Sequence, residues 1–257
     1  MSKFVVVIPA RYASERLPGK PLLEILGKPM IFHVCDRARE SSALEVIVAT
    51  DDERIADACE SYGVTVCMTG NQHRSGTERI AEVAEIMDWD DSTIVVNLQG
   101  DEPTMPASLI DQCAGLLADS DADIATLASP LMALDDYRNP NIVKVVVDQH
   151  DNALYFSRSP IPHVRNKALE DLALTAALHH HGIYGYRCGV LRRLVAADRA
   201  AIEMLEQLEQ LRALSLGMTI RVGRPVERPG AGVDTEDDLT LAAQQLAGTA
   251  GEDTPTS

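Results

Sequence analysis

The feature that most constrains the fold is an alternation of short, fully apolar segments with helical segments over the first 130 residues. The first apolar segment, Phe4–Ile8, is continuous, as is typical of a strand covered on both faces of a parallel sheet. Further strands are predicted over 45–49, 64–68, 93–98 and 124–127, and helices over 29–39, 54–62, 75–87 and 107–118. The pattern predicts an α/β fold with a doubly wound, mostly parallel sheet, which binds ligands at the carboxyl ends of its strands.

The pattern changes after about residue 130. Residues 143–147 and 153–156 flank a turn signal and predict an antiparallel hairpin. The remaining predicted elements are a strand over 181–186, a continuous helix over 201–216, a strand over 219–222 and a helix that begins near Thr235. We therefore predict a single domain over 1–247 with an antiparallel β-rich subregion, followed by a disordered tail over 248–257.

Composition excludes several classes of protein. Lys and Arg number 23 against 39 Asp and Glu, for a net charge of −16, so nucleic acid is not an expected partner. No segment approaches the roughly 20 apolar residues of a membrane span, so no membrane association is expected. Five cysteines without CxxC spacing favour free thiols and a cytoplasmic location.

A basic loop follows the first strand. It contains a hydroxyl and three cations within ten residues, namely Arg11, Ser14, Arg16 and Lys20. Arg and Lys at the carboxyl edge of a sheet are suited to holding a polyphosphate, because each contact is a charge-assisted hydrogen bond. The alternative is a solvated surface loop. The spacing matches neither a P-loop nor a GxGxxG fingerprint, which disfavours a nicotinamide-dependent enzyme.

Two aspartates are candidate magnesium ligands. Asp101 follows the strand over 93–98, where a carboxylate can hold Mg²⁺ together with substrate phosphates or, alternatively, cap a helix. In the segment 229–238, Thr235 is expected to cap a helix whose acidic first turn follows it, which leaves Asp234 for a metal.

Three histidines and a charged helix are harder to interpret. His179 and His181 alternate with His180 along a strand, so at most two of them could share a ligand, and we favour a substrate contact over a metal. Tyr184 lies further along the same predicted strand and is expected to line the same cleft. The predicted helix over 201–216 has a charged face, and its hydrophobic period alone favours a face exposed to solvent.

Thr77 is expected to cap the predicted helix over 75–87.

Eight segments resemble the 3-deoxy-manno-octulosonate (Kdo) cytidylyltransferase family, the CMP-Kdo synthetases. They are IPARYASERLPGKP (8–21), VATD (48–51), SGTER (75–79), NLQGDEP (97–103), ALYFSR (153–158), HHGIYGYR (180–187), LEQLR (208–212) and GVDT (232–235). The resemblance implies a nucleotide-diphosphosugar transferase fold and transfer of CMP from CTP to the anomeric hydroxyl of Kdo, with release of pyrophosphate, for lipopolysaccharide biosynthesis. It also implies Mg²⁺ as cofactor and a homodimer.

The resemblance also implies site residues. Arg11, Lys20, Asp101 and Asp234 would be catalytic, and the two aspartates would ligate Mg²⁺. The nucleotide would contact Arg11, Ser14, Arg16, Lys20, Ser75, Arg79 and Gln99. The sugar acid would contact Arg158, His180, Tyr184, Glu209 and Gln210, which replaces the solvated interpretation of the helix at Glu209 and Gln210. The nucleotide-binding part would then be about 1–130, and the sugar-binding and dimerisation part about 131–220.

Two departures from the family pattern leave alternatives open. Glu15 stands where the family usually has a hydroxyl residue, and the segment 162–178 is shorter and lacks the usual Trp and acidic pair. A modified Kdo is one alternative acceptor, and sialic acid or methylerythritol phosphate are others. A nucleotide-binding regulatory protein without turnover is the alternative from a different class.

Overall fold

The computed structural model describes residues 3–13, 17–230 and 232–249. The strands of the main sheet are β1 (Phe4–Pro9), β4 (Val46–Thr50), β5 (Thr65–Met68), β6 (Ile94–Asn97), β7 (Ile124–Pro130), β8 (Lys144–Val147), β9 (Ala153–Ser157), β10 (Leu178–Arg187) and β11 (Ile220–Gly223). Among the described residues these nine strands form one sheet, whose main path has the order β11-β7-β10-β6-β1-β4-β5. β1, β4, β5 and β6 pair in parallel, which confirms the predicted sheet type.

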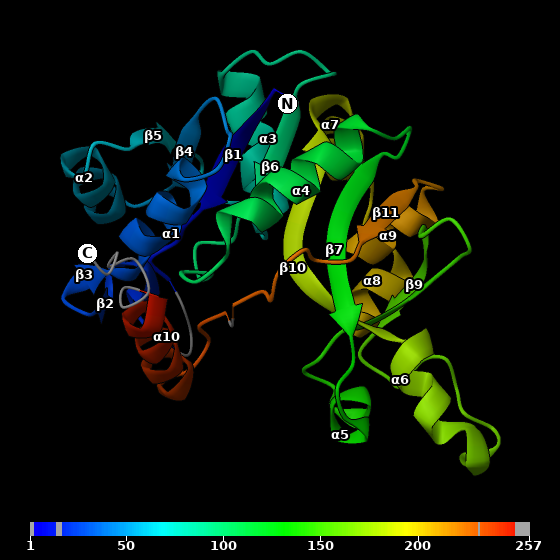
Figure 1. Ribbon diagram of the computed structural model, residues 1–257. Coiled ribbons are helices and arrows are strands. Elements are labelled where there is room, and N and C mark those ends of the chain that lie inside the picture. Colours follow the sequence, from blue (N-terminus) through cyan, green and yellow to red (C-terminus); the bar gives the residue numbers. More distant parts are fainter. Residues whose placement is uncertain (1–2, 14–16, 231, 250–257) are drawn as a thin grey trace, which may run out of the picture.

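Helices cover both faces of this sheet (Figure 1). The long ones are α1 (Met30–Arg39), α2 (Glu53–Ser61), α3 (Gly76–Ile86), α4 (Ala107–Ala118), α7 (Cys188–Ala196) and α10 (Glu236–Thr249). α1, α2 and α4 pack on one face, and α3 and α7 pack on the other. Successive residues of β1 contribute to the two cores in turn: Phe4, Val6 and Ile8 to the first, Val5 and Val7 to the second. This two-sided burial is why the first strand is apolar throughout.

β10 lies between the two strands that close the alternating part of the sequence. It runs antiparallel to both β6 and β7, so these two strands, which follow one another in the chain, are separated in the sheet. The pairing with β7 shifts register between His181 and Tyr184. β8 pairs with the beginning of β10 and with β9, which confirms the predicted antiparallel hairpin.

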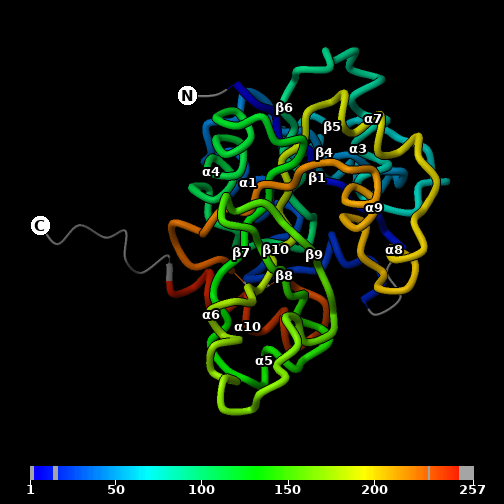
Figure 2. Tube along the Cα trace, turned by 90° about the vertical axis from the view of Figure 1, so that its right-hand side faces the viewer, coloured from blue at the N-terminus to red at the C-terminus, as the bar shows by residue number. Residues whose placement is uncertain are grey.

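Short elements complete the chain. They are the 3₁₀ helices η1 (Lys20–Leu22) and η2 (Lys167–Leu172), the strands β2 (Glu24–Ile25) and β3 (Lys28–Pro29), and the helices α5 (Leu134–Arg138), α6 (Ala173–Ala176), α8 (Ala201–Glu206) and α9 (Gln210–Ser215). α5 and α6 project together at one end of the molecule in both views (Figures 1 and 2). No helix within the described ranges has the length and apolar character needed to span a bilayer. All five cysteines are free and buried.

The predicted helix over 201–216 is wrong as a continuous element. It is split into α8 and α9 by Gln207, whose φ of 53° is in the left-handed region. The apolar side chains of this segment recur every three residues, at positions 202, 205, 208 and 211. Side chains with this spacing drift by about 60° per step around an α-helix, so in one continuous helix they could not all face the same core. The break resolves this conflict: Leu208 and Leu211 are buried, whereas Leu205 is 84% exposed.

Two predicted boundaries also need correction. Ser75, and not Thr77, caps α3, because the Ser75 hydroxyl accepts the Glu78 backbone N–H. α10 continues to Thr249, so residues 248 and 249 belong to a helix rather than to the expected tail. The rest of that tail, 250–257, lies outside the described residues.

A buried ion pair holds the two short helices together. The Arg212 guanidinium donates from Nε and Nη2 to the two carboxylate oxygens of Glu203, over 2.9 and 2.6 Å. The side chains are 5% and 1% exposed. Removing one partner of such a pair leaves an uncompensated buried charge, which is far more costly than losing an exposed pair.

Glu203→Gln is therefore expected to lower the free energy of unfolding by about 3–5 kcal/mol, because the neutral amide cannot compensate the buried Arg212. Urea unfolding followed by circular dichroism measures the change. The control is Glu170→Gln, which removes a solvent-exposed pair with Arg138 and is expected to cost at most about 1 kcal/mol. Equal losses of unfolding free energy in the two variants would contradict the stabilising role assigned to the buried pair of Arg212 and Glu203.

Candidate active site

Three distant segments meet at the carboxyl end of β1. Lys20 begins η1, Asp101 follows β6, and Asp234 precedes α10. The Lys20 Nζ atom donates to Asp101 Oδ2 over 2.7 Å and to Asp234 Oδ1 over 3.1 Å. The Lys20 side chain is 11% exposed, whereas the aspartates are 38% and 53% exposed. The two carboxylates that the sequence singled out therefore converge on one ammonium group, at the edge where ligands of such sheets bind.

Backbone contacts bring Asp234 to this position. The Val233 N–H donates to the Asp101 carbonyl over 2.8 Å, and the Val233 side chain is buried in a small core with Leu17 and Met30. Thr235 caps α10 as predicted: its hydroxyl accepts the Asp238 N–H, and the Asp238 carboxylate accepts the Thr235 N–H. The segment before α10 is thus fixed at both ends.

Gly100 allows the loop after β6 to approach β1. A Cβ atom at this position would lie 2.9 Å from the Pro9 carbonyl oxygen, which is too close for any side chain. Glycine at this position therefore lets the loop that carries Asp101 lie close to the end of β1.

A third carboxyl group adjoins the two aspartates. The Oε2 atom of Glu102 is buried and has no hydrogen-bond partner among the described residues. Burial, and then the charge of Asp101, raises the pKa of Glu102 to about 8. At neutral pH Glu102 is therefore mostly protonated, and the negative charge of the site comes from Asp101 and Asp234, two carboxylates against the single ammonium of Lys20. This excess of negative charge suits a divalent cation.

The described residues contain no ready-made cluster of three or more His, Cys, Asp or Glu side chains for a metal. This fits a cation that keeps few protein ligands, because Mg²⁺ is typically bound by one or two carboxylates plus substrate phosphates. The donor set of Asp101 and Asp234 matches that description.

Two adjoining cavities extend from this point. The first, of about 210 Å³, is lined by Pro9, Ala10, Arg11, Ala13, Lys20, Pro21, Met30, Gln99, Gly100 and Asp101. The second, of about 560 Å³, is lined by Arg11, Gln99, residues 74–78, Arg199, Glu203, Met204, residues 207–209 and Arg212. Arg11 and Gln99 line both, so the two cavities form one continuous site.

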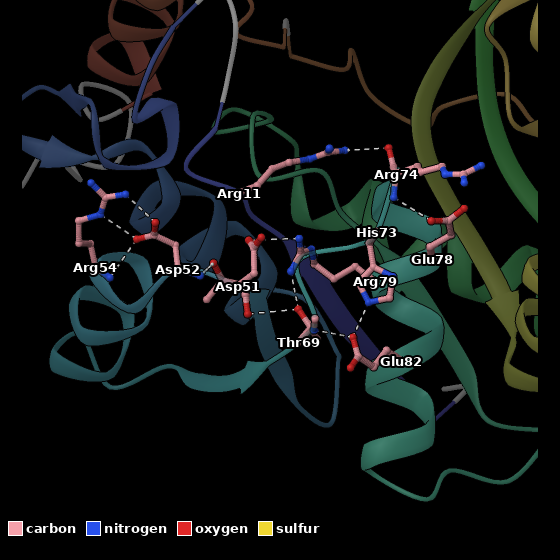
Figure 3. A network of polar contacts seen from close by, with 12 residues as sticks. Arg11, Asp51, Asp52, Arg54, Thr69, His73, Arg74, Glu78, Arg79 and Glu82 are labelled. Carbon is pink, nitrogen blue, oxygen red and sulfur yellow. Dashed lines mark hydrogen bonds and ion pairs between the residues drawn. The ribbon is translucent and has the colours of Figure 1, made fainter.

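Several of the predicted nucleotide contacts line this site. Arg11 donates to the Arg74 carbonyl over 3.3 Å (Figure 3). Gln99 donates to the Asn97 side chain over 3.0 Å, which orients its amide. Ser75 lines the larger cavity at the beginning of α3. Ser14, Glu15 and Arg16 lie outside the described residues.

Arg79 is placed differently from the prediction. Its side chain is 3% exposed, its Nη2 lies 3.2 Å from Asp51 Oδ1, and its Nη1 donates to the Thr69 hydroxyl (Figure 3). Arg79 is not among the described residues that line either cavity. Its ion pair with Asp51 and its hydrogen bond to Thr69 join α3 to the ends of β4 and β5. A contact of Arg79 with the nucleotide stays a prediction.

Three of the five predicted sugar contacts, Arg158, Glu209 and Gln210, lie in loops or at helix ends, and the other two lie on β10. Glu209 lines the larger cavity, and Gln210, 8% exposed, follows it at the beginning of α9. Arg158 lies further away: its Nε donates to the Glu206 carbonyl over 2.9 Å and its Nη1 to the Pro140 carbonyl over 3.2 Å.

The other two, His180 and Tyr184, lie side by side on β10, with ring centroids 5.2 Å apart. Burial, reinforced by the neighbouring histidines, lowers the pKa of His180 to about 3, so its ring is neutral. Its Nε2 is 3.0 Å from the Thr126 hydroxyl. Burial likewise holds the pKa of Tyr184 well above its usual value. Both side chains can therefore serve as neutral hydrogen-bonding groups at neutral pH.

Sequence reasoning did not predict several residues that line the larger cavity, among them Arg74, Thr77, Arg199 and Gln207. Thr77 was interpreted only as a helix cap, although it lies in the SGTER segment. The left-handed backbone of Gln207 brings the α8–α9 turn to the cavity, and no local signal in a glutamine indicates that conformation.

Comparisons with known proteins relate this chain to cytidylyltransferases. The cytidylyltransferase family model matches residues 5–220. A solved CMP:2-keto-3-deoxy-manno-octonic acid synthetase complexed with CTP is 43% identical, with 96% of this chain and 100% of that chain covered and a TM-score of 0.88.

Two more distant structures share the fold. One is a 4-diphosphocytidyl-2C-methyl-D-erythritol synthase from Anaerococcus prevotii (14% identity, 95% of this chain and 99% of that chain, TM-score 0.62). The other is a cytidylyltransferase from Leptospira borgpetersenii (16% identity, 100% of both chains, TM-score 0.60). With the family model spanning most of its length and a 43% identical relative aligned over 96% of it, the chain belongs to the cytidylyltransferase family.

Proposed function

We propose that this protein transfers CMP from CTP to the anomeric hydroxyl of Kdo, releases pyrophosphate, and so forms CMP-Kdo for lipopolysaccharide biosynthesis. The observation that carries the proposal is the 43% identity to a CMP:2-keto-3-deoxy-manno-octonic acid synthetase over nearly the whole chain. The site agrees with it, since cations and carboxylates that suit a magnesium triphosphate adjoin a second polar cavity large enough for an acceptor.

In this reaction the oxygen of the Kdo 2-hydroxyl attacks the α-phosphorus of CTP in line, the bond from that phosphorus to the pyrophosphate oxygen breaks, and the hydroxyl proton is released to solvent. Arg11 and Lys20 bind the phosphates and stabilise the charge that gathers on their oxygens. Gln99, which lines both cavities, and Ser75, which lines the larger one, contact the nucleotide. Catalysis is then mainly positioning and electrostatic stabilisation.

Mg²⁺ is the proposed cofactor, and Asp101 and Asp234 are its proposed ligands. The chemistry that this ion supplies when bound is neutralisation of charge on the phosphate oxygens. Lys20 contacts both aspartates in the protein without nucleotide. The same ammonium can turn to the triphosphate when a cation takes over the neutralisation of the two carboxylates.

The acceptor part of the proposal rests on Glu209, Gln210, Arg158, His180 and Tyr184. Glu209 lines the larger cavity, and a carboxylate there can accept hydrogen bonds from sugar hydroxyls. The Arg158 guanidinium suits the Kdo carboxylate, because its planar fork binds carboxylates in a bidentate manner. Arg158 is hydrogen bonded to the Glu206 carbonyl at the end of α8, directly before the segment 207–209 that lines the cavity.

We further propose that residues 1–130 bind the nucleotide, that residues 131–220 bind the sugar and form a homodimer, and that the enzyme acts in the cytoplasm. The projecting α5 and α6, and the exposed apolar side chains of Leu169 and Leu172 in η2, which leads directly into α6, support a role in assembly. Five free, buried cysteines support a reducing compartment.

Pyrophosphate release tests the proposed activity. We expect turnover with CTP, Mg²⁺ and Kdo, and much less with UTP or when Kdo is replaced by N-acetylneuraminate or methylerythritol phosphate. CTP binding without pyrophosphate release for any of these acceptors would instead favour a regulatory protein. Turnover with one of the other acceptors would identify a different cytidylyltransferase.

Asp101→Asn tests the metal ligands in the same assay. Loss of the carboxylate is expected to lower kcat by about 100-fold or more, because charge stabilisation at the reacting phosphate is lost. The matched control is Asp57→Asn, on the exposed surface of α2, which should keep wild-type activity. Wild-type turnover by Asp101→Asn would refute the ligand assignment.

Lys20→Met is expected to tighten Mn²⁺ binding about tenfold in the absence of CTP, because the ammonium no longer competes for Asp101 and Asp234. Electron paramagnetic resonance of free Mn²⁺ measures this without any turnover. The control is Lys28→Met, whose ammonium pairs with Asp36 and should leave the affinity unchanged. Unchanged or weaker Mn²⁺ binding by Lys20→Met would show that the two aspartates do not hold the cation.

A further inference from the structure

A hydrogen bond joins the nucleotide side of the site to the acceptor side. The Thr77 hydroxyl, in the first turn of α3, donates to Glu209 Oε2 over 2.8 Å across 132 residues of sequence. Glu209 precedes α9 and lines the larger cavity together with Thr77. The contact therefore connects the helix that begins beside the predicted nucleotide contacts to the segment predicted to bind the sugar.

The surroundings of Thr77 make this bond a defined one. The Thr77 side chain is 6% exposed, and a hydroxyl has a single proton to donate. The Tyr186 phenol is a second hydrogen-bond partner of the Thr77 hydroxyl, and its ring stacks on Tyr184 with centroids 5.7 Å apart. Burial holds the pKa of both phenols well above the usual value, so the Tyr186 phenol keeps its proton and can donate it to the Thr77 oxygen, which leaves the Thr77 proton for Glu209.

Glu209 needs such an anchor because other cations are within its reach. Arg212 lies close enough for its charge to interact with Glu209, and Arg199 lines the same cavity. A glutamate side chain with three rotatable bonds could turn toward either arginine. In the part of the chain that the structure describes, only the Oε2 atom of Glu209 is hydrogen bonded, which leaves Oε1 for a ligand in the cavity.

We propose that Thr77 is a positioning residue for the acceptor: its hydroxyl holds Glu209 in the orientation that accepts hydrogen bonds from the hydroxyls of a sugar acid. The inference rests on the proposed function, since it assigns a purpose to the acceptor cavity of that reaction. In this assignment Thr77 acts on the acceptor through Glu209.

The test compares Thr77→Val, which keeps the shape and removes the hydroxyl, with Thr77→Ser, which keeps the hydroxyl. For Thr77→Val we expect the KM for Kdo to rise about tenfold, equivalent to one hydrogen bond. The KM for CTP should stay within twofold of the wild-type value. The Tm should stay within about 2 °C of that of the wild type. Thr77→Ser should restore the KM for Kdo, and Thr240→Val, on the exposed surface of α10, is the matched control.

A double-mutant cycle separates positioning from a general structural effect. Glu209→Ala alone should raise the KM for Kdo, and adding Thr77→Val should raise it no further, because Thr77 then has nothing to orient. Independent effects in this cycle, equal changes in the two KM values, or failure of Thr77→Ser to restore binding would each overturn the inference. Absence of wild-type turnover with CTP and Kdo would refute the proposed function as well, which distinguishes the two failures.

Discussion

The site depends on one ammonium group that is shared by two carboxylates. Lys20 belongs to the loop after β1, Asp101 to the loop after β6, and Asp234 to the segment before α10, so a single charge holds three parts of the chain together. Two carboxylates against one ammonium leave one negative charge in excess. The ion pairs hold the three segments together, and the excess charge suits the site to a cation and a polyphosphate.

The surrounding elements of the fold position these three segments. The two-sided burial of β1 fixes the strand from which the basic loop begins, and Gly100 lets the neighbouring loop lie against Pro9. On the acceptor side, the buried pair of Arg212 and Glu203 holds α8 and α9 in place. Rigid elements thus surround a site whose polar side chains come from loops and helix ends, as is usual for α/β enzymes.

Local patterns predicted much of this. The parallel strands, the β8–β9 hairpin and the cap at Thr235 follow from hydrophobic period and turn chemistry, which act over a few residues. The interpretation of 201–216 as one helix was wrong because a strong local helix pattern was overridden by the need to bury Leu208 and Leu211. Arg79 was expected at the nucleotide, but no local rule shows that Asp51 would neutralise it inside the protein.

The sequence by itself determined the class of fold, the family resemblance and the identities of the charged residues, because period, turn chemistry and motif spacing are properties of neighbouring positions. Only the tertiary structure decided which of those residues meet. Asp101 and Asp234 converge through a backbone hydrogen bond between the Val233 N–H and the Asp101 carbonyl. Thr77 reaches Glu209 across 132 residues because α3 and α9 pack on the same face of the sheet. Contacts of this kind depend on how separate elements pack together, and that packing is decided by the core as a whole.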